Sequence, residues 1–244
     1  MPKFVELWVY LSSTPLFGLT ATLVVYLAAA QVSARLDQAP WANPVLWSVV
    51  VLSLALLAGG VKYEVYFAGA QFIHFLLGPA VVALGWPMWQ RRAVIRRNAA
   101  RLLAAAVVGA VAAAGSGFAI GWALGLPREV LLSLVPKSVT APVAMGIAEH
   151  IGGLPALTAT FAVIAGLVGA MSARYLYGLL RIPETPQGWI ARGFALGTAS
   201  HGIGAARALH VNADAGAYAG LALGLQVVLQ AFAIPLLFRL VHWH

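Results

Sequence analysis

Long stretches without a charged side chain constrain this sequence more than any other feature. Each of them exceeds the roughly 20 residues that a helix needs to cross the hydrocarbon core of a bilayer. Such long runs, without strand-like alternation, favour membrane helices over an outer-membrane barrel. The charge-free stretches cover residues 7–34, 38–61, 65–90, 102–127, 150–173 and 215–238. Two further apolar segments are shorter or interrupted, at 130–148, which contains Lys137, and at 193–206.

Composition excludes the soluble classes of protein. Of the 244 residues, 61% are hydrophobic and 9% are charged, whereas soluble domains are about 45–50% apolar and about 25% charged. A soluble enzyme could not bury so much apolar surface, and a disordered chain would be more polar. The net charge of +8 comes from basic residues that flank apolar spans, so it is not the footprint of nucleic-acid binding.

We therefore expect an all-α polytopic membrane protein, embedded in the lipid bilayer as one domain over residues 1–244. Roughly seven to eight transmembrane helices are predicted, with an internal repeat suggested by short sequence echoes. Broken or re-entrant segments are expected near 71–89, 130–150 and 193–208, where Pro and Gly interrupt apolar sequence. The expected helices cover residues 14–34, 44–59, 72–90, 99–124, 129–151, 157–179, 191–209 and 217–241.

Arginines predict the orientation. Five of them lie within residues 91–101, and the positive-inside rule predicts that this segment faces the cytoplasm of a bacterial inner membrane. Arg174, Arg181 and Arg192 favour the same side, which requires 129–151 to enter and leave the membrane from one side. If that segment crosses instead, the later loop is an exception to the rule, and the sequence leaves both topologies open.

The segment around Lys137 is the strongest candidate site. A charge within an apolar stretch costs about 2.5–3.5 kcal/mol, so it needs a partner or a water-filled cavity. Pro136 and Pro142 predict a discontinuous helix with unpaired backbone groups beside Lys137, Ser138 and Thr140. A cation, two hydroxyls and a helix N-terminus can bind a small carboxylate. The alternative is a structural lysine that extends to the membrane surface.

A second candidate segment lies at 194–204, where glycines and hydroxyls suit backbone that lines a cavity. Thr198, Ser200 and His201 are its polar side chains, and Arg207 follows on the helical face of Ser200. His201 could hold a substrate or a proton. Close packing through glycine explains the same residues equally well.

Glu149 lies next to His150 at the end of the first broken segment, where it could relay a proton, or where it could simply end a helix. The helix breaks themselves are predicted at small or cyclic residues. These are Gly78, Pro79, Pro136, Pro142, Gly197 and Gly202.

Two rows of glycines at four-residue spacing predict close helix packing, within the chain or across a homo-oligomer. They are Gly117, Gly121 and Gly125, and Gly216, Gly220 and Gly224. The sequence has no cysteine, and no residue cluster has the spacing of a metal or nucleotide site. Ser200 and His201 are adjacent and so lie on different helical faces, which disfavours an intramembrane hydrolase. We expect no enzyme activity and no cofactor.

These segments resemble the LrgB/CidB family along nearly the whole chain. The resemblance rests on PKSVTAP at 136–142, Glu149, IGG at 151–153 and ARGFALGTASHGIGAARA at 191–208. PLFG at 15–18 and QFIHFLLGPA at 71–80 add to it. The resemblance implies a holin/antiholin-like inner-membrane protein, paired with a small LrgA/CidA-type partner and linked to control of murein hydrolases and cell lysis. It also implies similarity to plastid glycolate/glycerate transporters and to bacterial proteins associated with pyruvate.

Two functions follow from these observations. In the first, the chain transports small monocarboxylates such as glycolate, glycerate or pyruvate, with Lys137 neutralising the carboxylate. In the second, it is a holin-like regulator of lysis that has no substrate of its own and assembles through its glycines. The lysine beside two prolines favours the first, because a regulator has no need of it.

Overall fold

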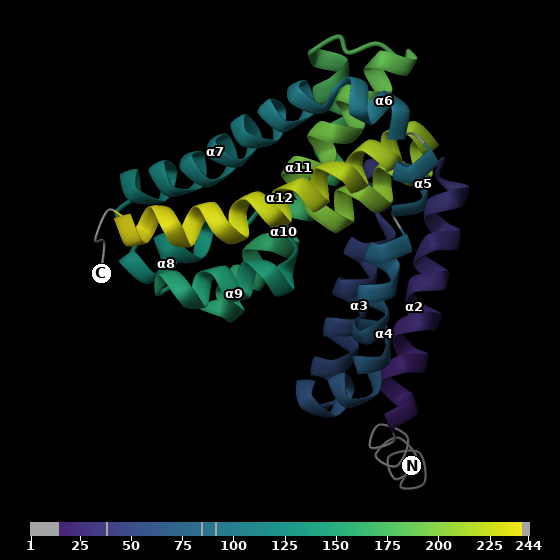
Figure 1. The fold of residues 1–244 in the computed structure, drawn as a ribbon. Coiled ribbons are helices and arrows are strands. Elements are labelled where there is room, and N and C mark those ends of the chain that lie inside the picture. Colours follow the sequence, from purple (N-terminus) through teal and green to yellow (C-terminus); the bar gives the residue numbers. More distant parts are fainter. Residues whose placement is uncertain (1–14, 38, 84, 91, 241–244) are drawn as a thin grey trace, which may run out of the picture. The chain divides into compact units, whose positions relative to one another are not determined.

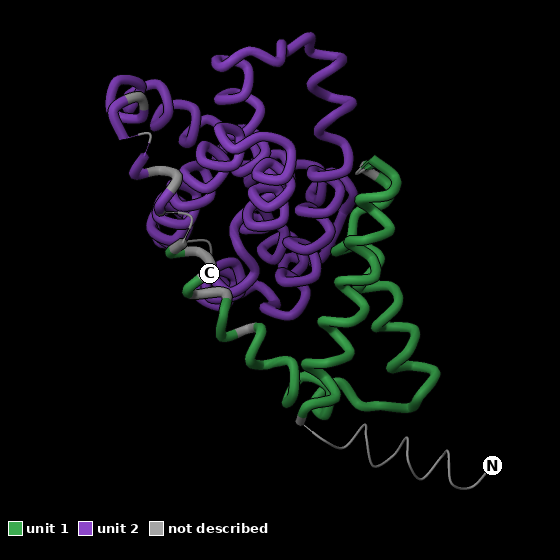
Figure 2. Tube along the Cα trace, turned by 90° about the vertical axis from the view of Figure 1, so that its right-hand side faces the viewer, with its two compact units in different colours: residues 1–83 green, residues 84–244 purple. Residues whose placement is uncertain are grey.

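The computed structural model describes residues 15–37, 39–83, 85–90 and 92–240, and every regular element in these ranges is a helix (Figure 1). The chain forms two compact units, Met1–Ala83 and Leu84–His244 (Figure 2). This agrees with the all-α class predicted from the sequence.

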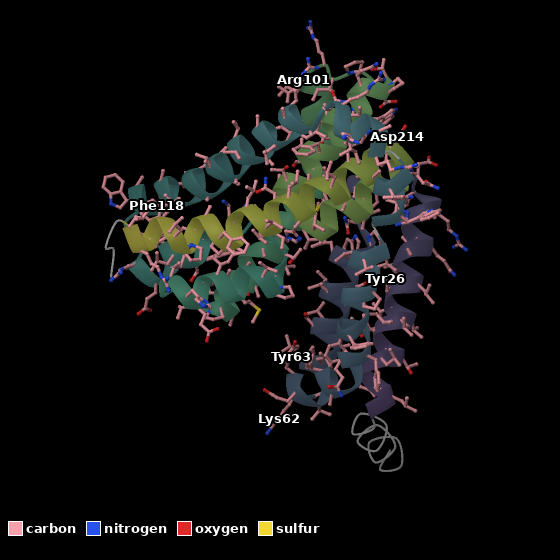
Figure 3. The ribbon with its side chains drawn as sticks, viewed as in Figure 1. Tyr26, Lys62, Tyr63, Arg101, Phe118 and Asp214 are labelled. Carbon is pink, nitrogen blue, oxygen red and sulfur yellow. The ribbon has the colours of Figure 1, made fainter. Side chains whose placement is uncertain are left out.

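The first unit packs α2 (Pro15–Arg35) against α3 (Pro44–Ala58) and α4 (Tyr63–Ala83), with a short 3₁₀ turn, η1 (Pro40–Ala42), between α2 and α3. Asn43 caps α3, because its side-chain oxygen accepts hydrogen bonds from the backbone of Val45 and Leu46. The hydroxyls of Thr22 and Tyr66 lie 2.7 Å apart and join α2 to α4. Lys62 and Tyr63 lie at the turn where α4 begins (Figure 3).

The second unit is built around its last helix. It contains α5 (Gly85–Gln90), α6 (Arg92–Arg97), α7 (Ala99–Ala123), α8 (Arg128–Leu134), α9 (Ala141–Ile151), α10 (Pro155–Leu179), α11 (Pro186–Val211) and α12 (Ala213–Leu240). Helix α12 contacts α5, α7, α9 and α11, and Figure 1 shows it running between α7 and the α8–α9 pair. A polar side chain on α12 can therefore find partners on several other helices.

Helices α11 and α12 pack with almost no space between their backbones. A side-chain carbon at Gly193 would collide with the backbone of Ala215, and one at Gly197 would collide with the backbone of Ala219. Both pairs advance by four residues, so the first part of α11 runs parallel to α12. Only glycine permits this approach, which explains two of the glycines in the segment.

Helix α11 reverses direction at His201. This residue has φ 39° and ψ −130°, far from helical values. A carbon added at Gly204 would lie 2.6 Å from the carbonyl oxygen of Leu196, although residues eight apart in a straight helix are separated by about 12 Å. The helix is thus two arms that meet at His201, beside Gly202, which agrees with the break predicted within 193–208. The predicted break at Gly197 is wrong, because that residue lies inside the first arm and gives room for the backbone of Ala219.

Arg192 fixes the beginning of the first arm of α11. Its guanidinium lies over the rings of Tyr177, at 5.5 Å, and Trp189, at 5.0 Å, and it pairs with Glu184 at 2.8 Å. The hydroxyl of Tyr177 donates to the carbonyl of Arg192 at 2.7 Å. These contacts tie the end of α10 to the start of α11.

The predicted break within 130–150 is also present, as a turn at 135–140 between α8 and α9. Pro136 lies in the turn, and Pro142 lies in the first turn of α9, where a missing backbone N–H costs nothing. Thr140 occupies the N-cap position of α9.

The predicted break at Gly78 and Pro79 is wrong in position. Helix α4 continues through both residues to Ala83, and a separate helix begins at Gly85. One proline removes a single helical hydrogen bond, which an otherwise favourable apolar helix tolerates. The expected start at residue 72 is also wrong, because α4 begins at Tyr63 and includes Glu64, whose charge favours a helix N-terminus.

Four helices in the described ranges are long and apolar enough to span a bilayer, namely Leu16–Arg35, Ala99–Ala123, Pro155–Leu179 and Ala213–Leu240. A fifth apolar helix, Pro44–Ala58, is shorter. The chain therefore has the helices of a membrane protein. The figure of seven to eight spans and the internal repeat stay predictions.

Candidate functional site: a polar centre between helices α7, α11 and α12

Lys137 lies in the turn between α8 and α9, half-buried. Its ammonium donates a hydrogen bond to the carbonyl oxygen of Ala113 on α7. A side-chain carbon at Gly117 would lie 2.6 Å from this ammonium, so the glycine provides the space that the lysine occupies. Across the described ranges, no carboxylate oxygen lies within 4.0 Å of the ammonium. In the described part of the chain, the ammonium is thus stabilised by the dipole of the Ala113 carbonyl group, and N–H donors remain for another ligand.

Two buried glutamines on α12 connect the Lys137 turn to α7. The amide nitrogen of Gln230 donates to the hydroxyl of Ser138, at 3.1 Å, and to the amide oxygen of Gln226, at 2.8 Å. The amide nitrogen of Gln226 donates to the carbonyl of Ala106, at 2.8 Å. Both glutamines are about 98–99% buried, so each bond forms away from water and fixes the side chains firmly.

Thr198, which lies just before the bend of α11 at His201, is also close to Gln226. A carbon at Gly109 would lie 2.5 Å from the Thr198 methyl group and 3.7 Å from the Gln226 amide nitrogen, so both side chains meet at Gly109. The Thr198 hydroxyl and the Gln230 amide oxygen are buried without a hydrogen-bond partner among the described residues. We call Lys137, Ser138, Thr198, Gln226 and Gln230 the polar centre.

The polar centre has the chemistry of a site for a small polar solute. Buried polar atoms without partners are rare and costly, and they are commonly satisfied by bound molecules. An ammonium together with amide and hydroxyl donors suits an anion, while the free amide oxygen suits a donor such as water or a hydroxyl group.

Ser200 and His201 face a different helix from the polar centre. The His201 imidazole Nε2 lies 2.8 Å from the carbonyl oxygen of Ala162 on α10, and Gly166 leaves room for the ring. Ser200 lies beside Gly169, also on α10, and its buried hydroxyl has no hydrogen-bond partner among the described residues. The structure thus gives both residues a place in the packing of α10 against α11.

The remaining predicted site residues lie apart from one another. Thr140 is the N-cap residue of α9, Arg207 lies on the returning arm of α11, and Glu149 is exposed near the end of α9. Glu149 lines a cavity with Arg128 and Arg239. Lys137, Ser138 and Thr198 are therefore the predicted residues that the structure groups around Gln226 and Gln230.

The glycines of the two rows differ in whether they contact another helix. Gly117 and Gly121 pack against the α8 segment, and Gly216 packs against Leu209 of α11. Gly125 has φ 67° just beyond the end of α7, where it ends the helix and does not extend the row. Gly220 is buried, whereas Gly224 is exposed with no atom within 4 Å of an added carbon. Packing within the chain thus explains Gly117, Gly121 and Gly216.

The sequence reasoning missed Gln226 and Gln230. They are two amides four residues apart inside the charge-free stretch 215–238, which places them on one helical face. Polar side chains inside a membrane helix seek partners in the protein interior, so this spacing was a usable signal.

Comparison with known proteins assigns the family. The profile described as the LrgB-like family matches residues 22–240. The chain belongs to the LrgB-like family. The match includes both broken segments and the whole polar centre.

Relatives of this family member cover nearly its full length. It is 35% identical over 221 residues to uncharacterized protein YxaC of Bacillus subtilis, which spans 91% of this chain and 94% of the relative. It is 29% identical over 219 residues to holin-like protein CidB of Staphylococcus aureus, with 90% and 93% coverage. No solved structure matches the chain.

Within the described ranges, no three His, Asp or Glu residues could hold a metal ion, and the absence of enzyme activity stays a prediction.

Proposed function

We propose that this LrgB-like chain is a holin-like protein of the bacterial inner membrane that takes part in the control of murein hydrolases and cell lysis. The observation that carries the proposal is the similarity to holin-like protein CidB over 90% of the chain. A holin-like protein acts by changing the permeability of the membrane, and the proposal includes a small LrgA/CidA-type membrane partner.

The polar centre supports a route for solutes within the protein. Lys137, Gln226, Gln230 and Thr198 lie between helices that are otherwise apolar. Polar groups at such a position would lower the cost of moving a hydrated solute across hydrocarbon. We assign the route to the second unit, because all of these residues belong to it.

A second candidate function is transport of small monocarboxylates, such as glycolate, glycerate or pyruvate. It is favoured by the half-buried ammonium of Lys137, which has no carboxylate within 4.0 Å in the described part of the chain. A substrate carboxylate would supply the missing counter-charge, with Ser138 and Gln230 nearby. The two functions differ in selectivity, since a carrier saturates and discriminates whereas a holin-like pore does not.

The purified chain reconstituted alone into vesicles separates the two. Vesicles are loaded with a radiolabelled neutral sugar or with labelled glycolate, glycerate or pyruvate, and release is followed with and without unlabelled solute outside. The holin-like function predicts release of the sugar and the acids alike, with no stimulation by external solute.

Saturable counterflow of the acids with full retention of the sugar would replace the proposal by the carrier function. Retention of every solute would contradict self-sufficient permeation, and co-reconstitution with the small partner then tests whether the partner opens the route. Protease protection of the inserted chain serves as the control for reconstitution in each case.

A further inference from the structure

Charged side chains gather at one end of the second unit, where α8 begins and where α9 and α12 end. They line a cavity of about 550 Å³. The charged or titratable members of its lining are Arg128, Glu129, Glu149, His150 and Arg239. None of them contributes to the polar centre.

A second cavity of about 490 Å³ adjoins the charged one. The two share His150, Pro235 and Arg239 in their linings, so they form one continuous depression. Most of the lining of the second cavity is apolar, with Val143 and Ile147 from α9 and Ala231, Phe232 and Leu236 from α12.

On both helices, the lining changes from apolar to charged towards the C-terminal end. On α9 the lining passes from Val143 to His150, and on α12 it passes from Ala231 to Arg239. Each stretch covers about 10–12 Å at the helical rise of 1.5 Å per residue. A depression that is apolar along its length and charged at one end matches an amphiphile, with its chain between the helices and its head at the membrane surface.

The charges at this end of the depression specify the headgroup. Two guanidiniums suit a phosphate group, and two carboxylates suit an ammonium group. Within the described residues, neither Glu149 nor Arg239 has an ion pair within 4.0 Å. Both signs of charge thus have groups able to meet a ligand.

We propose that this depression binds a phospholipid of the phosphatidylethanolamine class. Its phosphate lies at Arg239 and Arg128, its ammonium at Glu149 and Glu129, and one acyl chain along Ile147 and Phe232. Phosphatidylcholine carries the same charges but has no N–H donor for the carboxylates, and phosphatidylglycerol has no cation.

Lipid exchange on the purified full chain tests the site. The protein is delipidated in detergent and incubated with equimolar phosphatidylethanolamine, phosphatidylcholine and phosphatidylglycerol of identical acyl chains, and bound lipid is counted by native mass spectrometry. We expect roughly tenfold more bound phosphatidylethanolamine than either competitor, the factor typical of one charge-assisted hydrogen bond.

Substitutions locate the binding. Glu149→Gln should remove the preference over phosphatidylcholine, and Arg239→Gln should reduce the binding of all three phospholipids. Glu64→Gln and Arg101→Gln, exposed changes on other helices, should leave the pattern as in the unsubstituted chain. Circular dichroism confirms that each variant keeps its helices.

Equal binding of the three lipids, or an excess of phosphatidylglycerol, would overturn the proposal. So would an unchanged preference in Glu149→Gln together with unchanged binding of all three lipids in Arg239→Gln, since the lipid would then occupy another surface.

Discussion

Gly117 and Lys137 form a pair in which the absence of one side chain makes room for the other. The lysine ammonium occupies the space where a Gly117 side chain would lie, and it bonds to Ala113 one turn away. The glycine row in the sequence predicted close packing there. It could not reveal that the packed group is a charged side chain, because that depends on how the 135–140 turn folds against α7.

Gly117→Ala should therefore displace the Lys137 ammonium from Ala113. The flexible lysine can move aside, so the expected cost is that of its lost charged hydrogen bond, about 1.5–3 kcal/mol of stability, and thermal unfolding in detergent measures it. Gly115→Ala is the matched control on the same helix, since no atom lies within 4 Å of a carbon added there. Equal melting temperatures for the two variants would contradict the described position of Lys137.

Gln230 is the residue through which the polar centre holds together. Gln230→Leu removes the donor to Ser138 and to Gln226 and leaves buried acceptors behind, which we expect to cost about 1–3 kcal/mol. Gln187→Leu, at an exposed position on α11, should change the stability little. If Gln230→Leu melts at or above the temperature of the unsubstituted chain, the hydrogen bonds of the centre contribute nothing to folding.

At the scale of elements, the α11–α12 contact is set by glycines that touch backbone. Gly197→Ala should destabilise the second unit strongly, because its new carbon would collide with the backbone of Ala219, which cannot move as a side chain can. Gly224→Ala, in α12 with open space around it, should be neutral or slightly stabilising. Melting curves that rank these two variants the other way would disprove the close packing.

The two broken elements fold back on themselves. Arg128 and His150, from the outer ends of α8 and α9, line one cavity, so we infer that this segment enters and leaves the membrane from one side. The chain contains no cysteine, which makes single-cysteine labelling direct. Cysteines at 128 and 150 should react with an impermeant thiol reagent from the same side, and one at 101 should react from the opposite side.

Arg101 and Phe118 lie towards opposite ends of α7 (Figure 3), which is why position 101 reports the other membrane surface. Labelling of positions 128 and 150 from different sides would show that α8 and α9 cross the bilayer instead. Whole cells and inverted vesicles provide the two orientations for the measurement.

Across these elements, the sequence predicted what depends on local chemistry. Pro136, Pro142 and the glycines around His201 mark the breaks of α8–α9 and α11, because proline and glycine act on their own backbone. Pro79 misled the prediction, since a single proline in an apolar helix leaves the remaining bonds intact. The partnership of Gln230 with Ser138 spans 92 residues and depends on the fold of the whole second unit.

At the scale of the whole molecule, the described part of the chain combines apolar helices with the buried polar centre of the second unit. It belongs to the LrgB-like family and is similar to holin-like protein CidB, and the proposed role in permeability rests on that similarity. The physical claim is that solutes cross through the second unit beside Lys137. The charged depression at the ends of α9 and α12 is a separate feature that concerns the lipid around the protein.

The central claim is tested most directly by solute release from vesicles that contain equal amounts of inserted chain, with either Lys137 or Lys137→Met. Methionine keeps the length and apolar stem of lysine without its charge. We predict that the unsubstituted chain releases small solutes and that Lys137→Met slows release of anions at least tenfold, while Lys62→Met, an exposed change in the first unit, has no effect. Unchanged anion release by correctly inserted Lys137→Met would contradict a route through the polar centre.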